Sequence, residues 1–238
     1  MDGIKLINVG KFYTVDKESI RVLDGINLNI PENKITVILG RSGCGKTTLL
    51  RLVSGLEEFE QGEILGASSK RKAYVFQEDR LMSWLNVKKN ITFGLHNKAI
   101  DHSKVDEIIE TVGLEKFCSA YPSQLSGGMK QRVSIARAFA YAPDFIMMDE
   151  PFSALDFFTR EQMQKELIKI HEKLKCSILF VTHSIDEALI LGDKIVILEK
   201  GIVKSQYEIQ EKSGARDLLD DKFVKLKKQI IDDLKVIN

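Results

Sequence analysis

The sequence lacks a run of apolar residues long enough to cross a membrane. A helix that spans a bilayer needs about 18 or more predominantly apolar residues, and the 238-residue chain contains no such run. Residues 1–5 also lack the basic and apolar regions that open a signal peptide. We therefore expect a soluble protein, in which any membrane role is supplied by a partner.

Cysteine is scarce, and so is net charge. The three cysteines, Cys44, Cys118 and Cys176, have neither metal-binding nor redox-motif spacing, which suits a reducing cytosol. The formal net charge of +1 at pH 7 argues against a dedicated nucleic-acid-binding protein. Internal repeats and low-complexity linkers are absent too. The composition, 44% hydrophobic and 29% charged, is that of an ordinary globular protein.

One stretch near the N-terminus carries a complete phosphate-binding pattern. Residues 35–39 are apolar and mostly β-branched, as in a buried strand, and residues 49–53 have leucines at helical spacing. The pattern G-x-x-x-x-G-K-[ST] lies between them, and its glycines let backbone N–H groups converge on a phosphate at the start of the helix. Lys46 is the expected ligand of the β- and γ-phosphates, and Thr47 of Mg²⁺. The residues expected to bind the nucleotide are Gly40, Arg41, Ser42, Gly43, Cys44, Gly45, Lys46, Thr47 and Thr48.

Four polar residues each follow a predicted buried strand: Gln77, Asp149, Glu150 and His183. Because the carboxyl ends of parallel strands meet at one edge of a sheet, we expect these side chains near the phosphate loop. A single polar residue at a strand end is readily explained as a solvated terminus. Four of them beside a phosphate loop favour a catalytic site.

The elements around this core differ in type. Residues 4–9 and 20–30 alternate apolar and polar residues, which predicts antiparallel strands. Strand-like runs stop between residues 78 and 123, which predicts a helical segment inserted into an α/β core. Residues 159–175 and the tail from Asp217 have the periodicity of amphipathic helices.

Several features leave two interpretations open. Phe12 and Tyr13, in the first connection, are either core aromatics or a face on which adenine stacks. Trp84, the only tryptophan, is either core or an anchor for a partner. The tail is either a packed surface helix or a dimer contact. Residues 101–103 have the pattern of a helix start.

The motifs occur together in an order that characterises one protein family. They are residues 40–47, Gln77, residues 125–131 (Leu-Ser-Gly-Gly-Met-Lys-Gln), residues 145–150, residues 153–156 (Ser-Ala-Leu-Asp) and residues 182–183. In this set the chain resembles the ATP-binding subunit of an ABC transporter, over about residues 4–200. The sequence of residues 149–156 is similar to the corresponding sequence in importers of the nitrate/sulfonate/taurine type. The chain departs from those relatives at Ser83, where they usually carry proline, and at Ser184, where they usually carry aspartate.

The resemblance implies an α/β fold. It consists of a P-loop NTPase core with a mixed sheet, an antiparallel β subdomain and an inserted α-helical subdomain. The expected division of this single ABC ATPase domain (residues 1–238) gives residues 1–77 and 145–204 to the core with its antiparallel part, residues 78–144 to the helical subdomain with the signature motif, and residues 205–238 to a tail helix. We expect no room in this chain for the regulatory β-domain of sugar importers.

The resemblance also implies catalytic roles. Glu150 would polarise the attacking water, and His183 would contact the γ-phosphate. Gln77 would sense both Mg²⁺ and the γ-phosphate, and Asp149 would hold Mg²⁺ through water. Phosphoryl transfer depends on positioning and charge neutralisation more than on covalent catalysis. These residues therefore include the types of group that ATP hydrolysis needs. The expected cofactors are ATP and Mg²⁺. For ATP, Lys46 would be a catalytic ligand, and the Tyr13 ring would be the surface on which adenine stacks. For Mg²⁺, the expected metal ligands are Thr47, Gln77 and Asp149.

The implied partners begin with a second copy of the chain. Ser126, Gly127 and Gly128 would cover the γ-phosphate of that copy in a head-to-tail ATP-sandwich dimer, and Asp156 would cross the interface. Residues 78–93 would hold a helix of an integral membrane permease, which also links the subunit indirectly to an external solute-binding protein. No nucleic acid is expected.

The implied function is ATP hydrolysis that energises import of a small solute of the nitrate/sulfonate/taurine type. The implied location is the cytoplasmic face of the cell membrane, through the permease. Two alternatives stay open: a soluble ABC ATPase that acts on DNA or the ribosome, and an ABC subunit for lipoprotein release or cell division.

Overall fold

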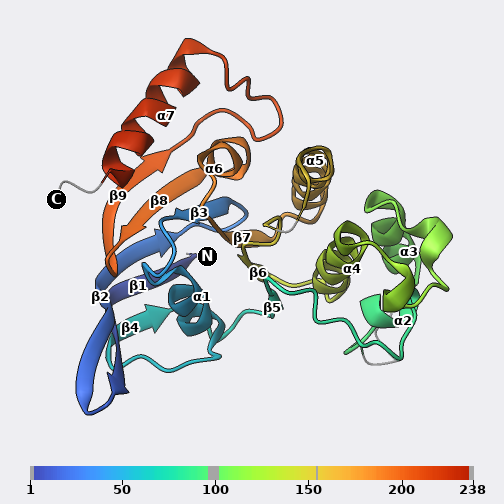
Figure 1. Ribbon diagram of the computed structural model, residues 1–238, viewed down its shortest axis with the longest axis horizontal. Helices are drawn as coiled ribbons and strands as arrows, with labels where there is room; N and C mark the ends of the chain where they lie inside the picture. Colours follow the sequence, from blue (N-terminus) through green and yellow to red (C-terminus); the bar gives the residue numbers. More distant parts are fainter. Residues whose placement is uncertain (1–2, 96–101, 154, 236–238) are drawn as a thin grey trace. The chain divides into compact units, whose positions relative to one another are not determined.

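The computed structural model describes residues 3–95, 102–153 and 155–235 (Figure 1). The chain divides into two compact units, Met1–Lys70 with Ser177–Asn238, and Arg71–Cys176. Asp101, at the predicted start of a helix, and Ala154, within the predicted Ser-Ala-Leu-Asp motif, lie outside the described residues. No described helix combines the length and the apolar composition that crossing a bilayer requires.

A mixed sheet forms the centre of the first unit. Its strands lie in the order β7-β3-β8-β9, with β3 parallel to β7 and β8, and with β9 antiparallel to β8. All five residues of β3 are buried, which explains why its sequence, apolar except for Thr36, does not alternate with exposed polar residues. β9 alternates exposed and half-buried residues, as an outer strand should. The bounds are β3 (Ile35–Leu39), β7 (Ser177–Thr182), β8 (Lys194–Glu199) and β9 (Ile202–Glu208).

An antiparallel sheet in the order β2-β1-β4 completes the strands of this unit. The prediction that Phe12 and Tyr13 lie in a connection is wrong, because β1 continues through both residues and pairs with β2. The hairpin turns at Asp16 and Lys17, whose φ angles of 51° and 70° are typical of a type I′ turn. The bounds are β1 (Ile4–Val15), β2 (Glu18–Ile30) and β4 (Gln61–Leu65).

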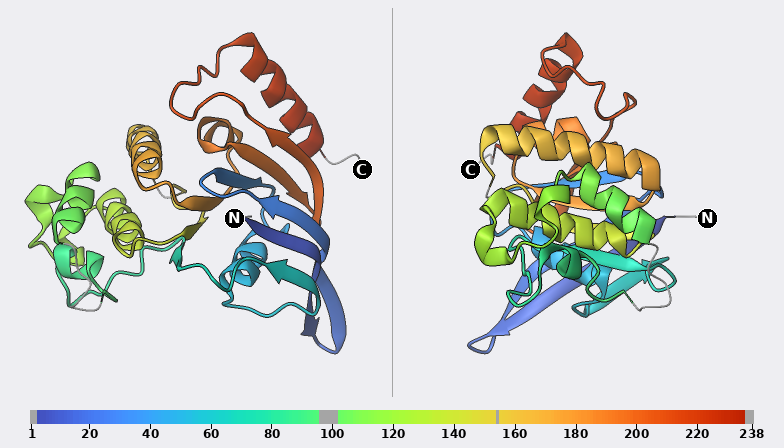
Figure 2. Two further views of the ribbon diagram at one scale, coloured as in Figure 1. Left: turned by 180° about the vertical axis from the view of Figure 1, so that it is seen from behind. Right: turned by 90° about the vertical axis from the view of Figure 1, so that its right-hand side faces the viewer.

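Three helices accompany these sheets. α1 (Lys46–Ser54) ends where expected, because Gly55 adopts the left-handed conformation of a C-cap, with φ 79°. α6 (Ile185–Leu191) packs on β3, and α7 (Asp221–Leu234) lies beside α6 and β8 (Figure 2). The tail helix begins later than predicted, because the Asp217 carboxylate accepts a hydrogen bond from the Leu219 amide and holds a turn there.

The second unit combines two parallel strands with four α-helices among its described residues. The strand predicted before Gln77 is β5, and it is half-buried because it pairs with β6 and ends the sheet order. The helix predicted from Thr159 starts two residues earlier, at Phe157. α3 buries one apolar face, formed by Val105, Ile108 and Ile109. The bounds are β5 (Lys72–Val75), β6 (Phe145–Asp149), α2 (Val87–Ile91), α3 (His102–Thr111), α4 (Gly127–Ala140) and α5 (Phe157–Leu174), with 3₁₀ turns at Glu115–Phe117 and Pro122–Gln124.

Candidate functional site

The phosphate loop of the first unit has a backbone that only glycine can adopt. Gly45 has φ 103°, and a Cβ atom there would lie 2.7 Å from Cδ2 of Leu23. A Cβ atom on Gly40 would lie 2.4 Å from the Leu198 carbonyl oxygen. Gly43 has φ 78° but faces open space. The loop therefore requires glycine for packing at Gly40, for conformation at Gly43 and for both at Gly45.

Lys46 closes this loop on itself. Its Nζ donates hydrogen bonds to the carbonyl oxygens of Gly40, at 2.9 Å, and of Arg41, at 3.0 Å, and its side chain is almost fully buried. Lys46 also begins α1, whose first turn contains no acidic residue and whose N-cap, Gly45, provides no capping side chain. The positive end of the helix is thus left for an external anion.

Tyr13 lies beside the phosphate-loop helix. Its hydroxyl donates a hydrogen bond to Glu57, and the Lys11 ammonium lies 5.1 Å from the centre of its ring. Burial and the Glu57 carboxylate raise the pKa of Tyr13, whereas hydrogen bonding with Thr48 acts in the opposite direction. Tyr13 is therefore a neutral aromatic residue, and the structure brings it together with Thr48 of the predicted site.

His183 lies at the end of β7 and lines a cavity of about 250 Å³ with Gly40 and Arg41. The next residue, Ser184, is the N-cap of α6 and accepts a hydrogen bond from the Glu187 amide at 3.3 Å. The Glu187 carboxylate in turn accepts from the Thr182 hydroxyl at 2.5 Å. These hydrogen bonds therefore fix the backbone on both sides of His183. Serine can replace the usual aspartate at position 184 because its hydroxyl also caps the helix.

In the second unit, Asp149 and Glu150 occupy the end of β6. The Tyr74 hydroxyl donates to Oδ2 of Asp149 at 3.3 Å, and Asp149 is 6% exposed. Glu150 has φ 44° although it is not glycine and precedes Pro151. Its carbonyl oxygen accepts from the amide and the hydroxyl of Ser153, at 3.1 and 2.9 Å. A left-handed residue before proline is strained by about 1 to 3 kcal/mol, and these hydrogen bonds hold it there.

Gln77 is exposed just beyond β5, and the segment that follows it is tied to α4. Arg137 on α4 donates to the carbonyl oxygens of Asp79 and Arg80, both at 3.1 Å. The Arg80 guanidinium lies 3.7 Å from the centre of the Phe76 ring. Within the second unit, Gln77 therefore stands at the start of a segment that the signature helix anchors.

The predicted signature residues open α4. Ser126 is the N-cap, and its hydroxyl accepts from the Met129 amide at 3.3 Å. A Cβ atom on Gly128 would lie 3.1 Å from Cγ2 of Thr159, so the start of α4 packs against the start of α5. Asp156 is the N-cap of α5, and hydrogen bonds from the Thr159 hydroxyl and amide lower the pKa of its carboxylate. Gly127 is exposed beside Ser126.

Comparison with known families decides the identity. Residues 23–153, more than half of the chain, match the family described as ABC transporter. The chain belongs to this family. The resemblance stated from the sequence motifs is thereby confirmed, and the chain is the ATP-binding subunit of an ABC transporter.

Curated relatives of this ABC subunit share a large part of its length. An uncharacterized ABC transporter ATP-binding protein of Methanocaldococcus jannaschii is 43% identical over 98% of this chain and 91% of that protein. The aliphatic sulfonates import ATP-binding protein SsuB of Bacillus cereus is 41% identical over 82% of this chain and 80% of its own. SsuB 2 of Pseudomonas syringae is 41% identical over 90% and 91%.

Solved structures of ABC cassettes have the same fold. A dimeric bacterial ABC transporter cassette matches with a TM-score of 0.77 and 32% identity, covering 87% of this chain and 99% of that one. A post-hydrolysis dimer of that cassette, bound to ADP and Pi, gives 0.76 and 31% over the same shares. CbiO1 of Clostridium perfringens gives 0.78 and 26%, covering 97% and 96%. The expected α/β P-loop NTPase fold is confirmed, and the chain is an ABC ATPase.

The sequence analysis missed three residues that position parts of this ABC subunit. Tyr74 and Arg137 hold Asp149 and the segment after Gln77 as described above. Asn90 of α2 is fully buried, accepts from the Met82 amide at 2.8 Å, and donates to three carbonyl oxygens of residues 82–86. A polar residue on the apolar face of a helix, as in Val-Lys-Lys-Asn-Ile, was the available signal. Trp84, in the loop that Asn90 holds, is 70% exposed and is not a core residue.

Proposed function

We propose that this ABC subunit hydrolyses ATP to drive solute import through a membrane permease, and that the transporter is of the nitrate/sulfonate/taurine type. The observation that carries the proposal is the glycine-dependent phosphate loop, which joins Lys46 to an uncapped helix N-terminus. The relatives named as aliphatic sulfonates import proteins support the solute class.

The first unit supplies binding groups for the nucleotide. Backbone N–H groups of residues 40–48 and the ammonium of Lys46 bind the phosphates. Tyr13 presents an aromatic face to adenine, with its hydroxyl held by Glu57. His183 donates a hydrogen bond to the γ-phosphate, and the α6 cap keeps its backbone in place. These groups orient ATP without themselves reacting.

The second unit supplies the groups that act on the attacking water and on the metal. Glu150 polarises the water, and its backbone is held in the left-handed conformation at this position. Gln77 and Asp149 of this unit, together with Thr47 of the first unit, would hold Mg²⁺, since each offers an oxygen ligand of the hard type that this ion takes. Asp149 fits this role because the Tyr74 hydroxyl fixes one of its oxygens. When bound, Mg²⁺ neutralises charge on the phosphate oxygens.

Two copies of the chain assemble around ATP in this proposal. Ser126, Gly127 and Gly128, at the N-terminal end of α4, bind the γ-phosphate of the second copy. Asp156 crosses the same contact. The dimeric cassettes among the solved structures support this assembly. ATP would then favour the closed dimer, and hydrolysis would release it.

The permease is the second partner. The exposed Trp84, on a loop that the buried Asn90 holds, provides an anchor for a permease helix near residues 78–93. This contact places the subunit at the cytoplasmic face of the membrane and links it indirectly to an external solute-binding protein. We also propose the division into a core with its antiparallel part, a helical subdomain at residues 78–144 and a tail from residue 205.

A pull-down from native membranes tests this function. Tagged Glu150→Gln protein is added with ATP to detergent-solubilised membranes, and proteins that co-purify are identified by mass spectrometry. We expect an integral membrane protein in stoichiometric amount, and its loss with Lys46→Ala as the matched control. Recovery of ribosomes or DNA without a membrane protein would overturn the transport function and leave the ATPase chemistry in place.

A further inference from the structure

Two neighbouring phenylalanines on the second unit are largely exposed. Phe157 and Phe158 are 71% and 79% exposed, at the first turn of α5 directly after Asp156. Their rings pack edge to face, with centroids 5.5 Å apart. Isolated exposed apolar side chains are ordinary, but a rigid pair of exposed aromatic rings is typical of an interaction surface.

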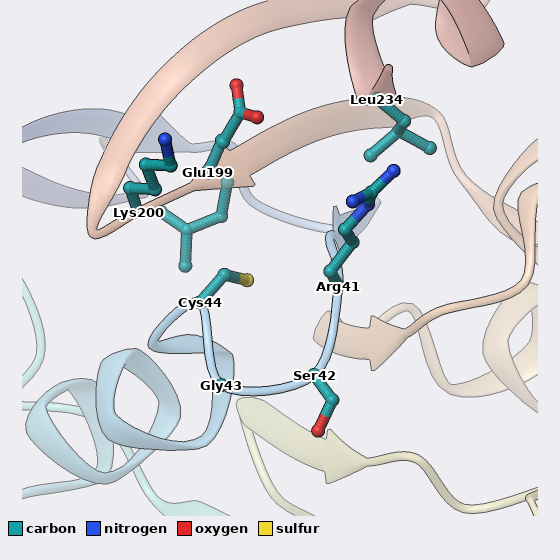
Figure 3. Close-up of a pocket in the computed structure, with 8 residues that line it drawn as sticks. Arg41, Ser42, Gly43, Cys44, Glu199, Lys200 and Leu234 are labelled. Carbon is teal, nitrogen blue, oxygen red and sulfur yellow. The ribbon is translucent and has the colours of Figure 1, made fainter. Parts of the chain in front are cut away.

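The first unit carries an apolar groove beside the phosphate loop. Two adjoining cavities, of about 240 and 250 Å³, share Arg41 and Leu234 in their walls. Figure 3 shows the Arg41 side chain directed toward Leu234, whereas Ser42 points away from the cavity. We call this the loop–tail groove, because the phosphate loop and the end of α7 form its opposite sides. Its apolar walls come from Ile185, Leu198, Ile231 and Leu234.

The aromatic pair and the loop–tail groove complement each other in chemistry. The groove offers aliphatic walls to the rings, and the Arg41 guanidinium offers a cation to a ring face. Lys200 and Lys235 also line the groove with one carboxylate, Glu199, so basic groups are in excess there, whereas the aromatic pair follows the Asp156 carboxylate. Opposite charges therefore frame the two apolar surfaces, which favours one orientation of contact over others.

We propose that, in the ATP-bound dimer, Phe157 and Phe158 of one copy insert into the loop–tail groove of the second copy. The inference rests on the proposed function, which places the start of α4 and Asp156 at the dimer contact. The packing of Gly128 on Thr159 makes the aromatic pair continuous with that surface. In a two-fold dimer the contact forms twice. It also gives the end of α7 a role, since Leu234 belongs to the receiving surface.

A mixed-dimer crosslink tests the contact. Both copies carry Glu150→Gln and Cys118→Ser, one copy also carries Phe158→Cys, and the other carries Leu234→Cys with a different tag. A short bismaleimide is added with and without ATP. We expect a crosslinked mixed dimer only when ATP and both new cysteines are present. The matched control is Glu172→Cys, an exposed position near the opposite end of α5, which should give no crosslink to Leu234→Cys.

A second measurement uses truncation of the rings. In the Glu150→Gln background, Phe157→Ala with Phe158→Ala should raise the dimer Kd at least tenfold by sedimentation, while ATP binding to the monomer stays within twofold. A dimer that forms but gives no crosslink and an unchanged Kd would overturn this inference alone. A Glu150→Gln protein that stays monomeric with ATP would overturn the proposed dimer and this contact together.

Discussion

Replacement of Arg216 by alanine should strongly destabilise the first unit. The Arg216 side chain is 1% exposed, and its guanidinium donates to carbonyl oxygens at both ends of the segment 189–211. The partners are Leu189 at 2.8 Å, Ile190 at 3.3 Å, Gly192 at 2.8 Å, and Glu211 at 2.9 and 2.6 Å. Burial lowers the pKa of Arg216, and Asp193 and Glu211 oppose this effect. The group therefore holds the C-terminal end of α6 to the loop before α7.

The magnitude follows from the type of bond lost. A hydrogen bond to a charged group contributes about 1.5 to 3 kcal/mol, and removal of one partner from a buried charged network costs about 3 to 5 kcal/mol. Because the lost bonds overlap, we expect the free energy of unfolding to fall by about 4 kcal/mol. Arg216→Lys should recover only part of this loss, since a single ammonium cannot reach carbonyl oxygens on both sides.

The assay is urea unfolding followed by circular dichroism, combined with hydrogen exchange of α6 and α4 amides. We expect α6 to lose protection while α4 keeps it. Lys222→Ala is the control, because Lys222 also pairs with Glu211, at 2.9 Å, but both side chains are largely exposed. Its effect on the free energy of unfolding should be far smaller than that of Arg216→Ala, because solvent screens this exposed pair. A loss below about 1 kcal/mol for Arg216→Ala, or equal losses for both variants, would refute the reasoning.

Three further predictions concern the site and the cysteines. Gly45→Ala should abolish ATP binding and cost more than about 2 kcal/mol, since both φ and the Leu23 contact oppose a Cβ atom, whereas Gly43→Ala should cost only about 1 kcal/mol; isothermal titration and urea unfolding compare them, and equal effects would contradict the packing argument. Glu150→Gln should bind ATP normally but lose at least 100-fold in turnover; unchanged phosphate release would remove Glu150 from its proposed role. Burial raises the pKa of Cys176 to about 12, so its thiol stays protonated in the folded state at pH 8. Iodoacetamide should then label the half-buried Cys118 but not Cys176, as read by peptide mass spectrometry, and equal labelling would contradict this.

The elements that were predicted correctly are determined by residues within those elements. The phosphate loop, β3 and α1 follow from glycines and apolar residues within one short stretch, and Gly55 ends the helix locally. The hairpin after Tyr13 was missed because Asp16 and Lys17 adopt positive φ without glycine. α2 was not predicted as a separate helix: it is only five residues long, and buried Asn90 ties it to the loop of residues 82–86 just before it.

The candidate site follows the same pattern. Residues that follow strands, such as Asp149 and Glu150, were predicted because the carboxyl ends of parallel strands lie at the same edge of a sheet. Tyr74 and Arg137 were not, because their partners are a carboxylate and two carbonyl oxygens that lie far away in the sequence. Common residue types with distant partners leave no local signal.

The left-handed backbone of Glu150 also indicates how an inactive relative could be recognised. Glycine or asparagine adopts φ near 44° at lower cost than glutamate, especially before Pro151. A cassette that no longer hydrolyses ATP would have no reason to keep the strained residue, and either substitution would make it more stable. Stability and turnover are thus opposed at this one position, so a gain in thermal stability there would mark the loss of the catalytic cycle.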